Sequence, residues 1–115
     1  MLVTQPALYG NAIDPATQAD LQWLQVDPET GVHGALAWWL LEEYNDATRE
    51  VGHNHGVQVI DLARELPKDS RLYVDFVHFS RAGAAQAAEI VARELCPLLQ
   101  QRFPPLVKGN CSADR

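Results

Sequence analysis

An apolar, β-branched run near the middle of the chain, Val57 to Leu62, most limits what this sequence can fold into. A strand that is apolar on both faces is typical of parallel sheets covered by helices on both sides. A second β-prone segment, Leu2-Val3-Thr4-Gln5-Pro6, stands at the first residues and is stopped by its proline. Between them, residues 35–51 carry apolar side chains at helical spacing, and Gly52 stands where a helix commonly stops. The order strand, helix, strand predicts an α/β fold with parallel strands.

A long segment with few periodic signals separates the first strand from that helix. Residues 7–34 collect glycine, proline, asparagine and aspartate around one short apolar cluster that includes Trp23. We predict a long loop with at most one helical turn, because these residue types interrupt helices and strands. Loops of this length in compact domains are usually lids or binding loops, or else disordered, and Trp23 favours a lid.

The last third of the chain predicts a loop followed by a long helix. Residues 62–66 suggest a short helix before Pro67, and residues 68–79 are expected to form a loop. Ser80 can cap the final helix, and Pro97 is expected to kink or end it. The apolar stripe expected to face the core is Ala84, Ala88, Val91, Leu95 and Leu98.

Composition indicates one globular domain and excludes several partners. The 115 residues are 47% hydrophobic and 21% charged, and we assign residues 1–103 to the domain and 104–115 to a polar tail. The 15 acidic and 9 basic residues are scattered, with a net charge of −6, so nucleic acid is not expected as a partner. The longest strictly apolar run, residues 35–41, is too short for a membrane span, and the first residues show no signal-peptide pattern. The compartment stays open, with the cytoplasm as the default.

One pair of residues in the predicted loop could carry chemistry. Asp75 and His78 lie three positions apart just before the final helix, close enough for the carboxylate to orient the imidazole and stabilise its charge. On spacing alone, the more common role of such a pair is to cap turns or the start of the helix. The sequence around the pair has to decide between the two.

The pair is one of several features that follow each other along the chain: Leu2-Val3-Thr4-Gln5-Pro6, Tyr44-Asn45, Val57 to Leu62, Leu66-Pro67 and Asp75-Phe76-Val77-His78-Phe79-Ser80-Arg81-Ala82-Gly83. Taken in order, these features resemble the C-terminal half of SGNH (GDSL-type) serine ester hydrolases, a family of lipases and esterases. The resemblance covers roughly residues 2–99, and its most specific part is the Asp-x-x-His pair followed by a glycine at the head of the last helix. It implies the last two strands of a flavodoxin-like, three-layer α/β/α fold, with His78 as general base and Asp75 as the residue that orients it.

The other half of the family's catalytic apparatus is not in the sequence. There is no Gly-Asp-Ser nucleophile block and no Gly-x-Asn-Asp oxyanion block, and Gly10-Asn11 is expected to form a turn. None of the three serines, Ser70, Ser80 and Ser112, resembles the nucleophile. We therefore expect a C-terminal fragment of a hydrolase acting on carboxylic ester bonds, inactive unless a serine-bearing N-terminal segment completes it. One sheet edge should be unpaired and open to self-association or to pairing with that segment.

Two other functions compete with this interpretation. The first is a non-catalytic remnant or partner-binding module that associates through the unpaired sheet edge. The second, weaker one is a metal-dependent hydrolase using His53, His55, Asp75 and His78. A small-molecule ester is the expected substrate under the leading hypothesis, and we expect no cofactor and no resident metal.

Overall fold

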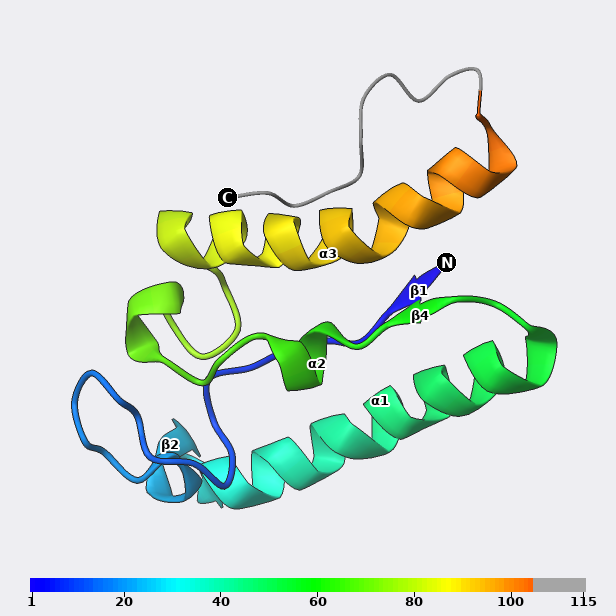
Figure 1. Ribbon diagram of the computed structural model, residues 1–115. Helices are drawn as coiled ribbons and strands as arrows, with labels where there is room; N and C mark the ends of the chain where they lie inside the picture. Colours follow the sequence, from blue (N-terminus) through cyan, green and yellow to red (C-terminus); the bar gives the residue numbers. More distant parts are fainter. Residues whose placement is uncertain (105–115) are drawn as a thin grey trace.

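The structure is a computed structural model that describes residues 1–104. Two short parallel strands, β1 (Leu2–Val3) and β4 (Val59–Ile60), lie between two helices of 22 residues, α1 (Gly34–His55) and α3 (Arg81–Arg102). The helices cover opposite faces of the strand pair (Figure 1). A small parallel sheet with a helix on each side agrees with the predicted α/β class.

Two glycines near the end of α1 have different tasks. The helix does not stop at Gly52, as the sequence suggested, but continues to His55 and ends at Gly56, whose φ of 61° is left-handed. Gly52 is buried because the helix packs against β4 there: a Cβ would lie 2.1 Å from Val59 Cγ2. Gly52 therefore allows the helix to pack closely on β4, and Gly56 allows the left-handed backbone that ends the helix.

The outer edge of β1 is open for a short stretch only. Leu2 and Thr4 donate their backbone N–H groups to the chain at β4, to Gln58 O and Ile60 O. The backbone N–H and C=O of Val3, between them, therefore point to the opposite edge of β1. At Gln5 that edge is closed by the side chain of Asn45 on α1, which accepts from Gln5 N at 2.8 Å and donates to Gln5 O at 3.0 Å. The predicted unpaired edge is thus confined to the first residues of β1.

Residues 7–34 are more ordered than the predicted loop. They contain one 3-10 turn, η1 (Leu21–Trp23), as expected, and also an antiparallel hairpin of β2 (Gln25–Asp27) and β3 (Val32–His33) that was not expected. The Asp27 carboxylate accepts from Glu29 N and Thr30 Oγ1, and Gly31 takes a positive φ of 73°. These turn contacts close the hairpin, whose strands are too short to show alternation in the sequence.

The last third follows the prediction in outline. The short helix α2 (Leu62–Glu65) and a 3-10 turn, η2 (Ser70–Leu72), lead to α3, whose cap is Ser80: its Oγ accepts from Gly83 N at 3.1 Å. The predicted core stripe of α3 was wrong at its start, because Gly83 and Ala87 are buried where Ala84 and Ala88 were expected. Gly83 lies on the buried face of α3 because the helix approaches the backbone of Leu72 there: a Cβ at this position would lie 1.9 Å from Leu72 O. The helix continues through Pro97 to Arg102.

The core lies on both sides of the strand pair. Its larger part packs α3 against the sheet and the loops before it, and a smaller part joins the start of α1 to the segment after β1. The predicted polar tail begins at Pro104, and residues 105–115 lie outside the described residues. Among residues 1–104 no helix is long and apolar enough to cross a membrane. The larger part of the hydrophobic core, on the α3 side of the strands, comprises Leu8, Leu21, Ile60, Leu62, Leu66, Leu72, Tyr73, Ala87 and Ile90.

Candidate functional site

The loop that carries Asp75 and His78 is a tight hairpin rather than an irregular segment. Tyr73 and Phe79 form an antiparallel bridge, and inside it Val74 N donates to His78 O at 2.9 Å. Just outside it, Ser80 N donates to Leu72 O, also at 2.9 Å. These bonds fix the backbone of His78 immediately before α3 begins.

The Asp75 carboxylate binds His78 through both of its oxygens. Oδ1 accepts the backbone N–H groups of Val77 and His78 at 2.8 and 2.7 Å, and Oδ2 lies 2.7 Å from His78 Nδ1. The backbone N–H of His78, then that of Val77, then the imidazole, lower the pKa of Asp75 to about 2. The carboxylate is therefore ionised at neutral pH, and it is also fixed in orientation by the turn that it closes.

This contact determines which imidazole nitrogen is available for chemistry. An ionised carboxylate can only accept, so in the neutral imidazole Nδ1 carries the proton and Nε2 keeps its lone pair. The side chain of His78 is 75% exposed, which leaves that nitrogen open to solvent. An oriented, accessible imidazole beside a carboxylate has the arrangement of a general base and its orienting group.

The turn at Asp75 does not decide between the two roles considered from the sequence. Bonds from Oδ1 to the N–H groups of Val77 and His78 are what a purely structural turn would make. A turn of this kind does not require a histidine side chain, yet Oδ2 is directed at His78 Nδ1. Asp75 closes the turn and orients the ring at the same time.

A half-buried lysine that no sequence motif marks holds the segment after β1, and that segment in turn contacts the hairpin. Lys68 Nζ donates to Ala7 O at 2.8 Å and to Tyr9 O at 2.7 Å, and it lies 3.3 Å from the centroid of the Trp38 ring. Between these two carbonyls, Leu8 N donates to Phe76 O at 2.8 Å. Burial lowers the pKa of Lys68 to about 8.

Gly10 lies against the side chain of Lys68. A Cβ at this position would lie 2.8 Å from Lys68 Cε and 3.0 Å from the Trp38 ring, and the backbone φ is 141°. Ala12 N donates to Gly10 O at 3.0 Å, so Gly10-Asn11 forms a close turn, as expected. Trp38 packs inward here whereas Trp39 is 57% exposed, so the two neighbouring tryptophans face different environments.

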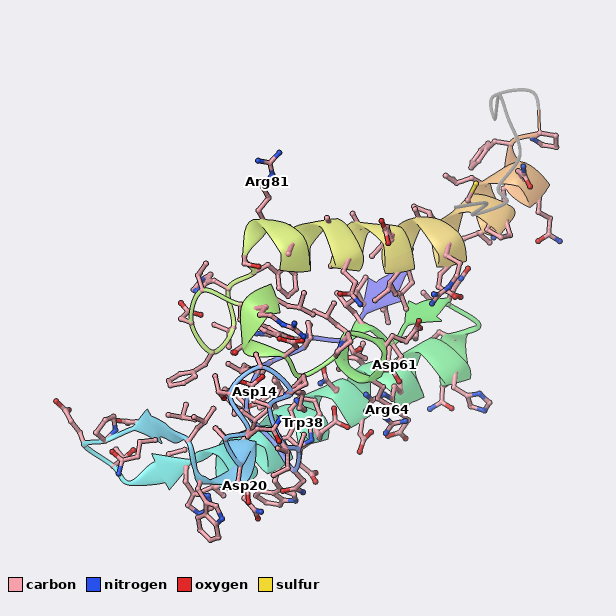
Figure 2. All side chains as sticks on the ribbon, turned by 60° about the vertical axis from the view of Figure 1, so that its left-hand side comes forward. Asp14, Asp20, Trp38, Asp61, Arg64 and Arg81 are labelled. Atoms are coloured by element: carbon pink, nitrogen blue, oxygen red, sulfur yellow. The ribbon has the colours of Figure 1, made fainter. Side chains whose placement is uncertain are left out.

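A second charged cluster lies where β1 and β4 end. Arg49 on α1 donates to both oxygens of Asp61, at 2.9 and 2.8 Å, and also bonds Glu42. Asp61 accepts from Thr4 Oγ1 at 2.8 Å, and that hydroxyl oxygen accepts from Ala63 N. Burial acts to raise the pKa of Asp61, but the bonds from Arg49 and Thr4 outweigh it and leave the pKa lowered. Figure 2 shows Asp61 and Arg64 close together at this cluster.

Neither serine that the structure describes is placed as a nucleophile. Ser80 Oγ donates to Arg71 O at 2.7 Å and caps α3. Ser70 donates its backbone N–H to Asp14 Oδ1 at 3.0 Å, and its side chain also hydrogen-bonds the Asp14 carboxylate. The third, Ser112, lies outside the described residues. Arg81, the first residue of α3, points away from the body of the molecule (Figure 2).

The structure does not bring together the four residues considered for a metal site. His53 and His55 lie in the last turn of α1, and the Asp75 hairpin lies at the other end of the molecule, beside the start of α3 (Figure 1). Among residues 1–104 there is no group of three or more potential metal ligands. The weaker alternative of a metal-dependent hydrolase therefore does not fit the geometry, because the two pairs belong to opposite ends of the fold.

Known proteins give no further guide to this hairpin. No family model, no curated protein and no solved structure matches the chain. The site therefore has to be interpreted from its own geometry.

Proposed function

We propose that this chain supplies the acid–base half of a Ser-His-Asp hydrolase of carboxylic esters, as the C-terminal part of an SGNH-like, flavodoxin-like domain. His78 is the general base, Asp75 orients it, and the nucleophilic serine and the oxyanion donors come from another segment. The observation that carries the proposal is the 2.7 Å contact between His78 Nδ1 and Asp75 Oδ2 in a hairpin that leaves the imidazole exposed.

In the proposed reaction His78 carries one proton, and Asp75 stabilises the charge that this creates. Nε2 of His78 accepts the proton of the serine hydroxyl as the oxygen attacks the ester carbonyl, and later returns it to the leaving alkoxide. Asp75 stays ionised, as its lowered pKa of about 2 requires, and stabilises the imidazolium that forms between the two steps. Residues 7–34, with the exposed Trp23, would then lie over the substrate as a lid.

The chain by itself should not turn over esters by this route. Losing the nucleophile of a serine triad costs a factor of roughly 10⁶ in kcat, equivalent to about 8 kcal/mol. The two described serines are committed to other bonds, and the oxyanion donors of the family are not in the sequence. Activity has to depend on a serine supplied from elsewhere.

The test compares the 115-residue chain with a protein extended by the coding region upstream of it. The coding region upstream is examined for a Gly-Asp-Ser block in frame, and the extended protein is labelled with a fluorophosphonate probe and assayed with p-nitrophenyl esters. We expect labelling and turnover in the extended protein, loss of both in its His78→Ala variant, and neither in the 115-residue chain. An extended protein without the serine block, or with turnover that does not depend on His78, contradicts the proposal.

A second candidate function has its own support: a non-catalytic module that binds a partner through the sheet edge. Val3 faces the unpaired edge of β1 and is 42% exposed, and Met1 beside it is 53% exposed. Unpaired strand edges of this kind accept further strands. Replacing Val3 by proline removes the free N–H, so this function predicts loss of partner binding, whereas the Asp75–His78 contact should be unaffected.

A further inference from the structure

The helix α1 carries more apolar surface than the fold covers. Its buried residues are Gly34, Ala37, Asn45 and Gly52. Gly34 packs against η1, and the other three lie against β4 and the residues that follow β1. On one flank a second apolar row stays exposed, with Leu40 at 45%, Tyr44 at 75% and Val51 at 49% exposure. These side chains belong to the helical apolar pattern of the sequence, but the two strands are too narrow to cover both rows.

The exposed row has the spacing of a helix–helix contact. Leu40, Tyr44, Ala47 and Val51, which we call the α1 seam, are separated by four, three and four positions. Alternating steps of three and four residues place side chains on one line facing a neighbouring helix. Ala47, the exposed small residue in the middle, allows a partner backbone to come close.

The seam lies on the flank of α1 that the charged cluster does not use. Arg49, which reaches Asp61 beyond the end of β4, stands two positions from both Ala47 and Val51. Two positions correspond to roughly 200° around a helix, so Arg49 and the seam occupy nearly opposite flanks. A helix packed on the seam would therefore leave the ion pairs of Arg49 in place.

The acidic residues beside the α1 seam indicate which kind of partner helix can pack on it. Glu43 and Glu50 are seven residues apart, lie along one border of the seam, and form no ion pair within residues 1–104. In coiled-coil terms they stand at a flanking position that pairs with charged residues of the facing helix. A second copy packed antiparallel would bring Glu43 of one chain against Glu50 of the other, and each chain already carries a net charge of −6. A basic border on the partner suits these carboxylates.

We propose that the α1 seam binds an amphipathic helix of a partner whose flanking positions carry Lys or Arg. Apolar side chains of that helix at three- and four-residue spacing pack between Leu40, Tyr44 and Val51, and its basic residues pair with Glu43 and Glu50. This inference does not depend on the ester chemistry of His78, because none of these residues belongs to the hairpin.

The test uses the full chain and two synthetic helices. Both peptides carry leucine at every a and d position over about three heptads, with lysine at the flanking positions in one and glutamate in the other. Binding is measured by fluorescence anisotropy at low and high salt. We expect the lysine peptide to bind at least about tenfold more tightly than the glutamate peptide, with the difference shrinking as salt rises.

Two variants and one control make the result specific. Tyr44→Ser combined with Leu40→Ser should abolish binding, and Glu43→Lys with Glu50→Lys should reverse the preference between the peptides. Trp23→Ser removes an exposed apolar side chain outside the seam, 66% exposed, and should leave binding unchanged. Circular dichroism confirms that each variant is folded. Equal binding of both peptides, no binding of either, or a dimer of the chain that Tyr44→Ser dissociates, overturns the proposal.

Discussion

Two carboxylates of this protein, Asp61 and Asp75, each bind a basic side chain, but their surroundings differ. Asp61 meets Arg49 across 12 residues and Thr4 across 57, and joins α1, β1 and β4. Asp75 meets His78 across three residues within one hairpin, and both side chains are exposed, at 51% and 75%. The long-range, half-buried pair holds the fold together, whereas the local, exposed pair contributes little to the fold and is accessible to solvent.

The largest expected effect is at the Arg49 cluster. Arg49→Met should lower the free energy of unfolding by about 3 kcal/mol, because Asp61 and Glu42 lose their hydrogen-bonded cation and are left with the longer contacts of the more exposed Arg64, at 3.8 and 3.7 Å. Urea denaturation measures the change. A loss below about 1 kcal/mol, the range of exposed ion pairs, would remove the distinction between the two carboxylates.

Lys68, which holds the segment after β1, should have the next largest effect on stability. Lys68→Met keeps the aliphatic contact with Trp38 but leaves Ala7 O and Tyr9 O without their donor, so we expect a loss of about 2 kcal/mol. Amide hydrogen exchange should also show faster exchange at Leu8 N, which donates to Phe76 O in the hairpin. If exchange there is unchanged, Lys68 does not support the hairpin.

A substitution at Tyr73 should raise the free energy of unfolding instead of lowering it. Its hydroxyl is buried and has no hydrogen-bond partner among residues 1–104. Burial raises the pKa of Tyr73 to about 12. Tyr73→Phe removes the unsatisfied group and keeps the ring against Phe79, so it should stabilise the fold by about 1 kcal/mol. A destabilised variant would mean that the hydroxyl does make a hydrogen bond in solution.

The smallest change in stability is expected at His78 itself. His78→Ala removes an exposed side chain whose backbone bonds to Val74 and Asp75 remain, so the free energy of unfolding should change by less than about 0.5 kcal/mol. The same urea series as for Arg49→Met gives the comparison directly. Similar losses for both variants would make His78 a structural residue.

The sequence predicted the order of elements well and the charged cluster not at all. The run Val57 to Leu62 correctly indicated a parallel strand beside the one at Leu2, although only Val59–Ile60 is strand because Leu62 already begins α2. The Asp75–His78 contact could be anticipated because it is local. The contacts of Lys68 with Tyr9 and of Thr4 with Asp61 join residues 59 and 57 positions apart, and no sequence periodicity reports such pairs.

Acid titration tests the ionised state of the Asp75 carboxylate. The folded-state pKa of Asp75, about 2, lies below its ordinary value of 3.8, so the stability it contributes is present above that ordinary value and is lost as pH falls toward 2. Asp75→Asn should therefore flatten the stability profile between these two pH values without changing its slope elsewhere. An identical profile for the variant would show that the turn does not hold an ionised carboxylate.

The role proposed for the hairpin requires that Asp75 hold His78 in the form that a general base needs. Nitrogen-15 NMR of the isotope-labelled chain at neutral pH shows which ring nitrogen carries the proton. We expect His78 protonated at Nδ1 with Nε2 free, and a shift toward the Nε2-protonated form in Asp75→Asn. His78 protonated at Nε2 in the unmodified chain, or a tautomer that Asp75→Asn leaves unchanged, would contradict this role.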